Sequence, residues 1–186
     1  LKYFKKFKTL EFFLVFFLLV IFFTIRLKII DYGLPFFQQE DENAFLKSTI
    51  VFLSFISGIK PVMNDPVFAP FVNLILSLKF IFINEFILDS YSFSEIKQKI
   101  YNDPSILILY GRYNSLILTT LGLFLIYLIF KKLKINFIIY FPLLVSISYS
   151  LFTIPISLSN GKNSYYFFLF LLQLYFFIKY YFKLEK

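Results

Sequence analysis

The sequence predicts an all-α integral membrane protein with about four transmembrane helices and a large outer loop that carries juxtamembrane helices. Hydrophobic residues make up 59% of its 186 residues, and aromatic residues make up 24%. Several apolar runs approach the roughly 20 residues that an α-helix needs to cross the hydrocarbon core of a bilayer. This composition is too apolar for a soluble domain of the same length.

Composition also excludes several kinds of chemistry. The chain has no cysteine and no histidine, which removes thiol nucleophiles, disulfides, zinc sites built on soft ligands and imidazole catalysis. Its net charge of +8 comes from basic residues that lie beside apolar runs, as expected for lysines that face anionic lipid headgroups. We therefore expect a lipid bilayer and no nucleic acid as a partner. The five scattered glycines form no phosphate-binding loop.

The first predicted span covers residues 9–30 and follows a lysine-rich N-terminus. Arg26 and Lys28 lie near its end, where their side chains could snorkel to the headgroups. A signal peptide is the alternative, but no small-residue cleavage pattern follows the apolar run. An uncleaved anchor with a cytoplasmic N-terminus is the favoured interpretation.

Three further spans are predicted at residues 106–130, 135–156 and 164–182. The apolar segment 71–88 is a fifth candidate, but Lys79 lies at its middle, and a central lysine costs about 2.5–3.5 kcal/mol on insertion scales. If segment 71–88 does not cross, the N-terminal lysines, the Lys131 cluster and the C-terminal lysines all face the cytoplasm, as the positive-inside rule requires. We therefore expect four spans, with 71–88 lying along the outer membrane surface or dipping into the membrane from the outer side.

This topology creates an outer loop over residues 31–105, which holds every acidic residue except Glu11 and Glu185. A polar run ending in Asp41 and Glu42 opens a predicted juxtamembrane helix at 41–57. Two interpretations of this pair are open. Asp41 could be an N-cap and Glu42 a first-turn acid that complements the helix dipole, or the two carboxylates could do chemistry at the depth of a lipid headgroup.

Arg112 interrupts the apolar sequence near the start of the span 106–130. An arginine at the edge of a membrane is costly and normally has a specific partner, such as a lipid phosphate or a carboxylate. The alternative is an arginine that snorkels to the interface.

The order of these features resembles one enzyme family. An Asp-Glu pair stands at the start of a juxtamembrane helix in QQEDENAF, and a Gly-x-x-Pro turn with further prolines follows in GIKPVMNDPVFAPF. An arginine then leads into a span in YGRYNSLILTTLGLFLIYLIF, and a basic turn follows in KKLK. This order is similar to that of the GT-C fold glycosyltransferases, in particular the group with protein O-mannosyltransferases and the enzyme that adds aminoarabinose to lipid A. We expect the chain to be an N-terminal fragment of such a protein.

The resemblance implies transfer of a sugar from a polyprenyl-phosphate donor to a glycan, lipid or protein acceptor at the outer face of the inner (plasma) membrane. Asp41 would accept the proton of the acceptor hydroxyl with help from Glu42, and Arg112 would bind the donor phosphate. Asn163 stands where the family often has a second aspartate, and an amide cannot act as a base. No cofactor is required by this scheme, although a divalent metal ion is compatible with it.

Two alternatives are kept. A polytopic transporter or flippase segment would use Lys79, Arg112 and the outer acids to line a substrate path. A non-catalytic member of the same fold would explain why Asn163 replaces an aspartate. Loss of sugar transfer on substitution of Asp41 would distinguish an enzyme from both.

Overall fold

The structure is a computed structural model that describes residues 2–31, 102, 105–150, 153, 156 and 163–184. Over these residues it is all-helical, in the order α1 (Lys2–Leu27), α5 (Ser105–Lys132), α6 (Phe137–Ser148) and α8 (Asn163–Leu184). The chain divides into two compact units. The first comprises Leu1–Ile30, Ser115–Leu158 and Asn163–Lys186, and the second comprises Asp31–Asn114 and Ser159–Lys162.

Helix α1 buries one narrow stripe of side chains and exposes the rest of its surface. The buried residues recur at helical spacing, namely Val15, Leu18, Leu19, Phe22 and Arg26. On the opposite side, the large apolar residues Phe13 and Phe17 are more than 60% exposed. An aromatic face that no protein element covers is expected where the surroundings are lipid rather than water.

Helix α5 is the central helix of the first unit. In the segment of α5 that is long enough to cross a membrane, 56% is buried, compared with 28% of the corresponding segment of α1. Helix α5 also contacts all three other helices. It ends in a Schellman motif, in which Lys134 donates to the carbonyl of Lys131 and Ile135 donates to the carbonyl of Phe130. Lys134 takes the left-handed conformation that this motif needs, with φ of 57°.

Helix α6 begins and ends with side-chain hydrogen bonds to its backbone. The side chain of Asn136 accepts from the Ile138 amide and caps the N-terminus. At the other end, the Thr153 hydroxyl lies 2.6 Å from the carbonyl oxygen of Ile147 and 3.0 Å from that of Ser148. The helix therefore ends at Ser148, well before the end of the span predicted at 135–156.

Helix α8 packs on α5 at a glycine. A Cβ atom placed on Gly122 would lie 2.6 Å from Cε1 of the Phe167 ring and 3.3 Å from a methyl carbon of Leu171. Because real Cβ contacts are longer than this, a larger residue at position 122 would require the Phe167 ring to move. The bounds of α8 agree with the helix predicted at 164–182, whereas its role as a membrane span stays a prediction.

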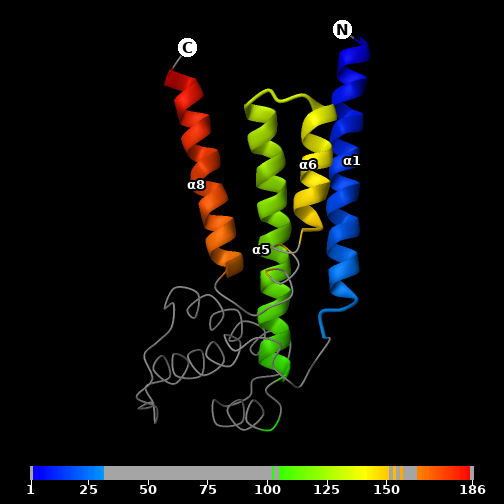
Figure 1. The fold of residues 1–186 in the computed structure, drawn as a ribbon, viewed down its shortest axis with the longest axis vertical. Helices are drawn as coiled ribbons and strands as arrows, with labels where there is room; N and C mark the ends of the chain where they lie inside the picture. The colour runs from blue at the N-terminus through cyan, green and yellow to red at the C-terminus, as the bar shows by residue number, and fades with distance from the viewer. Residues whose placement is uncertain are drawn as a thin grey trace, which may run out of the picture. The chain divides into compact units, whose positions relative to one another are not determined.

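Within the first unit, the helices run alongside one another (Figure 1). The N-terminal end of α1, the α5–α6 turn and the C-terminal end of α8 lie at the same end of this bundle. Within this unit, helix α5 therefore runs antiparallel to α1. Lysines of all three basic clusters accordingly gather at one end.

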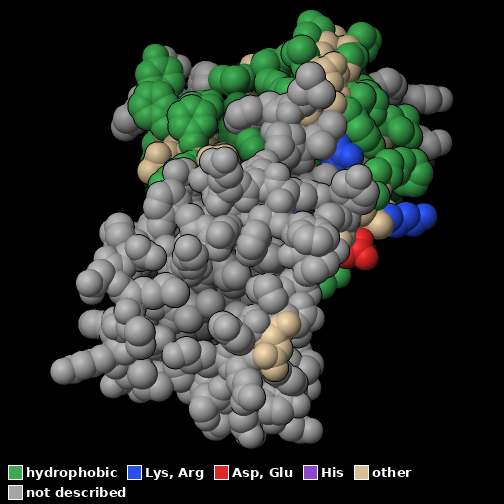
Figure 2. Space-filling view, turned by 60° about the horizontal axis from the view of Figure 1, so that its bottom comes forward, with side chains coloured by type: hydrophobic (Ala, Val, Ile, Leu, Met, Phe, Trp, Pro, Cys, Tyr) green, Lys and Arg blue, Asp and Glu red, His purple; other side chains and the backbone are tan. Residues whose placement is uncertain are grey.

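Two helices in the described part of the chain are long and apolar enough to cross a membrane, Thr9–Leu27 in α1 and Gly111–Lys132 in α5. They correspond to the spans predicted at 9–30 and 106–130. Helix α6 is apolar but shorter. Apolar side chains form most of the surface that is drawn in colour in the space-filling view (Figure 2).

Candidate functional site

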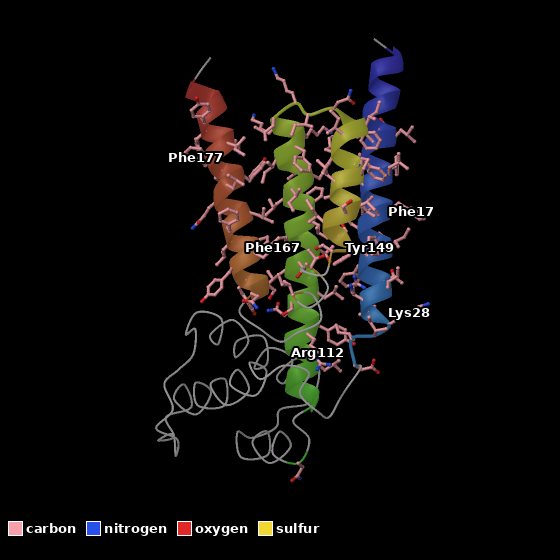
Figure 3. The ribbon with its side chains drawn as sticks, in the orientation of Figure 1. Phe17, Lys28, Arg112, Tyr149, Phe167 and Phe177 are labelled. Atoms are coloured by element: carbon pink, nitrogen blue, oxygen red, sulfur yellow. The ribbon has the colours of Figure 1, made fainter. Side chains whose placement is uncertain are left out.

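Arg112, the predicted phosphate-binding residue, is fully buried in α5, with 0% of its surface exposed (Figure 3). The same turn of the helix buries the polar residues Asn114 and Ser115. Arg112 and Asn114 each have an interaction partner. A snorkelling arginine would expose its guanidinium group, whereas that of Arg112 is buried. The burial instead favours an arginine that is held by specific partners.

Asn163, the position at which the family often has a second aspartate, is the first residue of α8 and is exposed. The next residue anchors this helix end to α5, because the Ser164 hydroxyl donates to the Ser115 hydroxyl oxygen over 3.0 Å. Both serines are 1% exposed. The position of Asn163 is therefore fixed by a buried hydrogen bond one residue away.

The remaining predicted site residues, Asp41 and Glu42, lie outside the described residues, as do the juxtamembrane helices predicted at 41–57 and 71–88. Arg112 belongs to the second compact unit, whereas Asn163 belongs to the first. The roles of Asp41 and Glu42 and their grouping with Arg112 therefore stay predictions.

A polar cluster that the sequence analysis did not identify connects α1, α5 and α6. It consists of Glu11, Tyr127, Lys131 and Tyr140. The Tyr140 hydroxyl donates to Oε1 of Glu11. Nζ of Lys131 donates to the Tyr127 hydroxyl over 2.9 Å and lies 3.9 Å from the same carboxylate oxygen of Glu11.

The burial and ring packing of this cluster indicate a role in holding the helices together. Tyr140 and Tyr127 are each 1% exposed, and their rings also pack on each other with centroids 6.1 Å apart. The sequence contained a signal for it, since Glu11 is an acid within an apolar run, and such an acid needs a partner from another helix. A hydroxyl donor and a lysine supply that partner here.

Arg26 also differs from expectation. Its guanidinium carbon lies 5.3 Å from the ring centroid of Phe22, four residues earlier, and 5.9 Å from that of Tyr149. The side chain therefore points back along α1 instead of towards the helix end, and only 6% of the residue is exposed. The prediction that Arg26 snorkels is wrong, because its guanidinium group packs against the rings of Phe22 and Tyr149. Lys28, the first residue after the helix, is exposed as expected.

The described residues include no group of three or more histidine, cysteine, aspartate or glutamate side chains that could hold a metal ion. Comparisons with protein-family models, curated proteins and solved structures found no match to this chain. The case for a function therefore depends on the chemistry of the residues and on the resemblance described above.

Proposed function

We propose that this chain is part of an integral membrane glycosyltransferase that transfers a sugar from a polyprenyl-phosphate donor to an acceptor at the outer face of the plasma membrane. The observation that carries the proposal is the complete burial of Arg112 in a helix of membrane-spanning length. In the proposed complex, the guanidinium group exchanges the partners that hold it in this structure for the phosphate leaving group, whose negative charge it neutralises through two parallel hydrogen bonds.

The topology of the first unit supports the same proposal. Because α1 and α5 are antiparallel (Figure 1), the chain between them begins and ends at one face of the proposed membrane. That chain contains Asp41 and Glu42. With the lysine-rich end of the bundle in the cytoplasm, the two carboxylates belong to the outer side, as Arg112 does near the start of α5.

In the proposed reaction, an acceptor hydroxyl attacks the anomeric carbon of the donor sugar. Asp41 takes the hydroxyl proton with assistance from Glu42, the new glycosidic bond forms, and the bond to the phosphate oxygen breaks. The electron pair of that bond remains on the lipid phosphate, where Arg112 stabilises the charge. A base on one side of the sugar and a stabilised leaving group on the other match an oxocarbenium-like transition state.

The test is sugar transfer by membranes that contain the full protein with Asp41→Asn. The probes are polyprenyl-phosphate mannose and polyprenyl-phosphate aminoarabinose, the donors suggested by the two groups that the sequence resembles. Removal of a general base is expected to lower the rate about 10²- to 10⁴-fold. Asp89→Asn, which alters another acid of the same loop, is the matched control and should leave transfer unchanged. Equal transfer by the Asp41→Asn protein and the control would refute the catalytic assignment.

A transport function is the second candidate, and one observation favours it. Arg26 is a further buried cation within a helix of membrane-spanning length, and buried ionisable groups often line a substrate path. Flipping of a labelled polyprenyl-phosphate lipid in reconstituted vesicles, without any sugar transfer, would support the transporter over the enzyme. A non-catalytic GT-C-like protein would show neither activity.

A further inference from the structure

Two of the three guanidinium nitrogen atoms of Arg26 lack a hydrogen-bond acceptor among the described residues. Its Nε and Nη2 atoms are buried, and neither has a hydrogen-bond partner in the part of the chain that the structure describes. Buried arginines are normally paired with a carboxylate, a phosphate or carbonyl oxygens. Two adjacent N–H groups that point the same way are the arrangement that binds two oxygens of one anion.

Two aromatic rings hold this group in place. Phe22 and Tyr149 flank the guanidinium carbon at 5.3 and 5.9 Å, and the rings themselves meet edge to face with centroids 6.5 Å apart. Figure 3 shows Tyr149 beside the C-terminal half of α1. Ring faces attract a cation, but they provide no oxygen acceptor for its N–H groups.

Other local features do not replace an anion. The C-terminal end of α6 precedes Tyr149, and its partial negative charge favours a nearby cation. However, the Ile147 carbonyl accepts from both the Thr153 hydroxyl and the Ser150 amide, and the Val145 carbonyl accepts from the Tyr149 amide. These carbonyl oxygens are therefore already engaged, and Nε and Nη2 of Arg26 do not donate to them.

The depth of Arg26 indicates what kind of anion could reach it. It lies 15 residues after Glu11 in α1, which corresponds to about 22 Å along the helix. Glu11 and Lys131 belong to the basic end of the bundle. In a hydrocarbon core of about 30 Å, the guanidinium group lies just below the opposite headgroup layer.

The surface next to Arg26 is apolar. Tyr149, whose ring covers the guanidinium group, is 39% exposed, and the neighbouring Ile25 and Leu27 are 42% and 39% exposed. A rotation of the Tyr149 side chain would open the guanidinium group sideways, towards the acyl chains of lipids. An anion that arrives by this route must carry an apolar tail.

From this geometry we propose that Arg26, between Phe22 and Tyr149, binds the phosphate group of a membrane lipid. The lipid lies against the exposed apolar side chains of α1, and two phosphate oxygens accept from Nε and Nη2. The inference rests on the membrane residence proposed above, but it does not require glycosyl transfer. Asp41→Asn should therefore leave lipid binding intact, and a protein without sugar transfer could still bind the lipid.

The experiment measures lipid retention by the purified full chain in detergent, using native mass spectrometry. The probes are phosphatidylglycerol, a diglucosyl diacylglycerol with the same acyl chains but no phosphate, and inorganic phosphate. The wild-type protein should retain phosphatidylglycerol at least about tenfold more tightly than the neutral glycolipid. Arg26→Gln should abolish this preference. Lys28→Gln, which removes an exposed cation two residues away, is the matched control and should stay within about twofold of wild type, since exposed charges contribute little.

Arg26→Lys is the second variant, in case the glutamine variant fails to fold. It keeps the charge but has no planar pair of donors, so an intermediate preference is expected. The proposal is overturned if the wild-type protein does not distinguish phosphatidylglycerol from the neutral glycolipid, or if Arg26→Gln binds as wild type does. Equal occupancy by inorganic phosphate would also overturn it, because the site would then bind a free anion.

Discussion

Replacing Tyr140 by phenylalanine tests the polar cluster that connects three helices. The change removes only the hydroxyl that donates to Glu11. The ring contacts of Tyr140 with Phe130 and Phe137, at centroid distances of 5.8 and 5.4 Å, remain available. The experiment therefore isolates one hydrogen bond without making a cavity.

The expected loss of stability follows from the burial of the partners. A hydrogen bond to a charged group contributes about 1.5–3 kcal/mol, and Tyr140 is 1% exposed while the Glu11 side chain is 15% exposed. The remaining contact of Glu11 with Lys131 is long, at 3.9 Å, and the lysine side chain is 42% exposed. Since exposed ion pairs contribute at most about 1 kcal/mol, Lys131 cannot compensate. The equilibrium constant for unfolding should rise about 10- to 150-fold.

The assay is reversible unfolding in mixed micelles of dodecyl maltoside and sodium dodecyl sulfate. Helicity is followed by far-ultraviolet circular dichroism, because the chain contains no tryptophan. Tyr166→Phe, at a residue that is 57% exposed, is the matched control and should change stability by less than about 0.5 kcal/mol. Glu11→Gln combined with Tyr140→Phe should cost less than the sum of the single changes. Equal stabilities for Tyr140→Phe and Tyr166→Phe would refute the role of the cluster.

Two further predictions concern the α5–α6 turn and the topology. Lys134→Gly should stabilise the protein by about 1 kcal/mol, since glycine has no steric penalty at the φ of 57° that Lys134 adopts. Lys132→Gly, within the last turn of α5, should instead destabilise it by about 1 kcal/mol. Unfolding curves that rank the two variants the other way would contradict the motif. On the cysteine-free background, single cysteines at the exposed residues Lys28 and Lys132 should react with a membrane-impermeant maleimide from opposite sides of the membrane, and labelling of both from one side would contradict the proposed crossing.

Apolar periodicity and length predicted the long helices well. The spans expected at 106–130 and 164–182 correspond to α5 (Ser105–Lys132) and α8 (Asn163–Leu184). In both cases the apolar run has clear polar boundaries, such as Lys131 and Asn163. The start of α6 at Phe137 lies close to the start of the span predicted at 135–156.

The end of α6 could not be predicted in the same way. The run after Ser148 contains no glycine, and its apolar character continues to Ile154. The helix ends because hydroxyl groups bond to its last carbonyl groups, and such side-chain competition depends on the three-dimensional turn. Sequence spacing shows that serine and threonine are present, but not which carbonyl oxygens they bind.

The candidate site shows a similar division. A buried Arg112 held by partners was one of the two interpretations that followed from its position in an apolar segment. The burial of Arg26 did not, because the direction of its side chain depends on the neighbouring rings of Phe22 and Tyr149. Two arginines in similar sequence surroundings can therefore be indistinguishable until the helices that pack on them are placed.

The early end of α6 has a consequence for the bilayer around it. Its 12 residues extend about 18 Å, roughly 12 Å less than an average hydrocarbon core. A short helix beside long ones favours local thinning of the bilayer, at a cost of fractions of a kcal/mol for each ångström of mismatch. In the proposed membrane, lipids with shorter acyl chains would then collect beside α6, and bilayer thickness would become a variable that sets the stability of the protein.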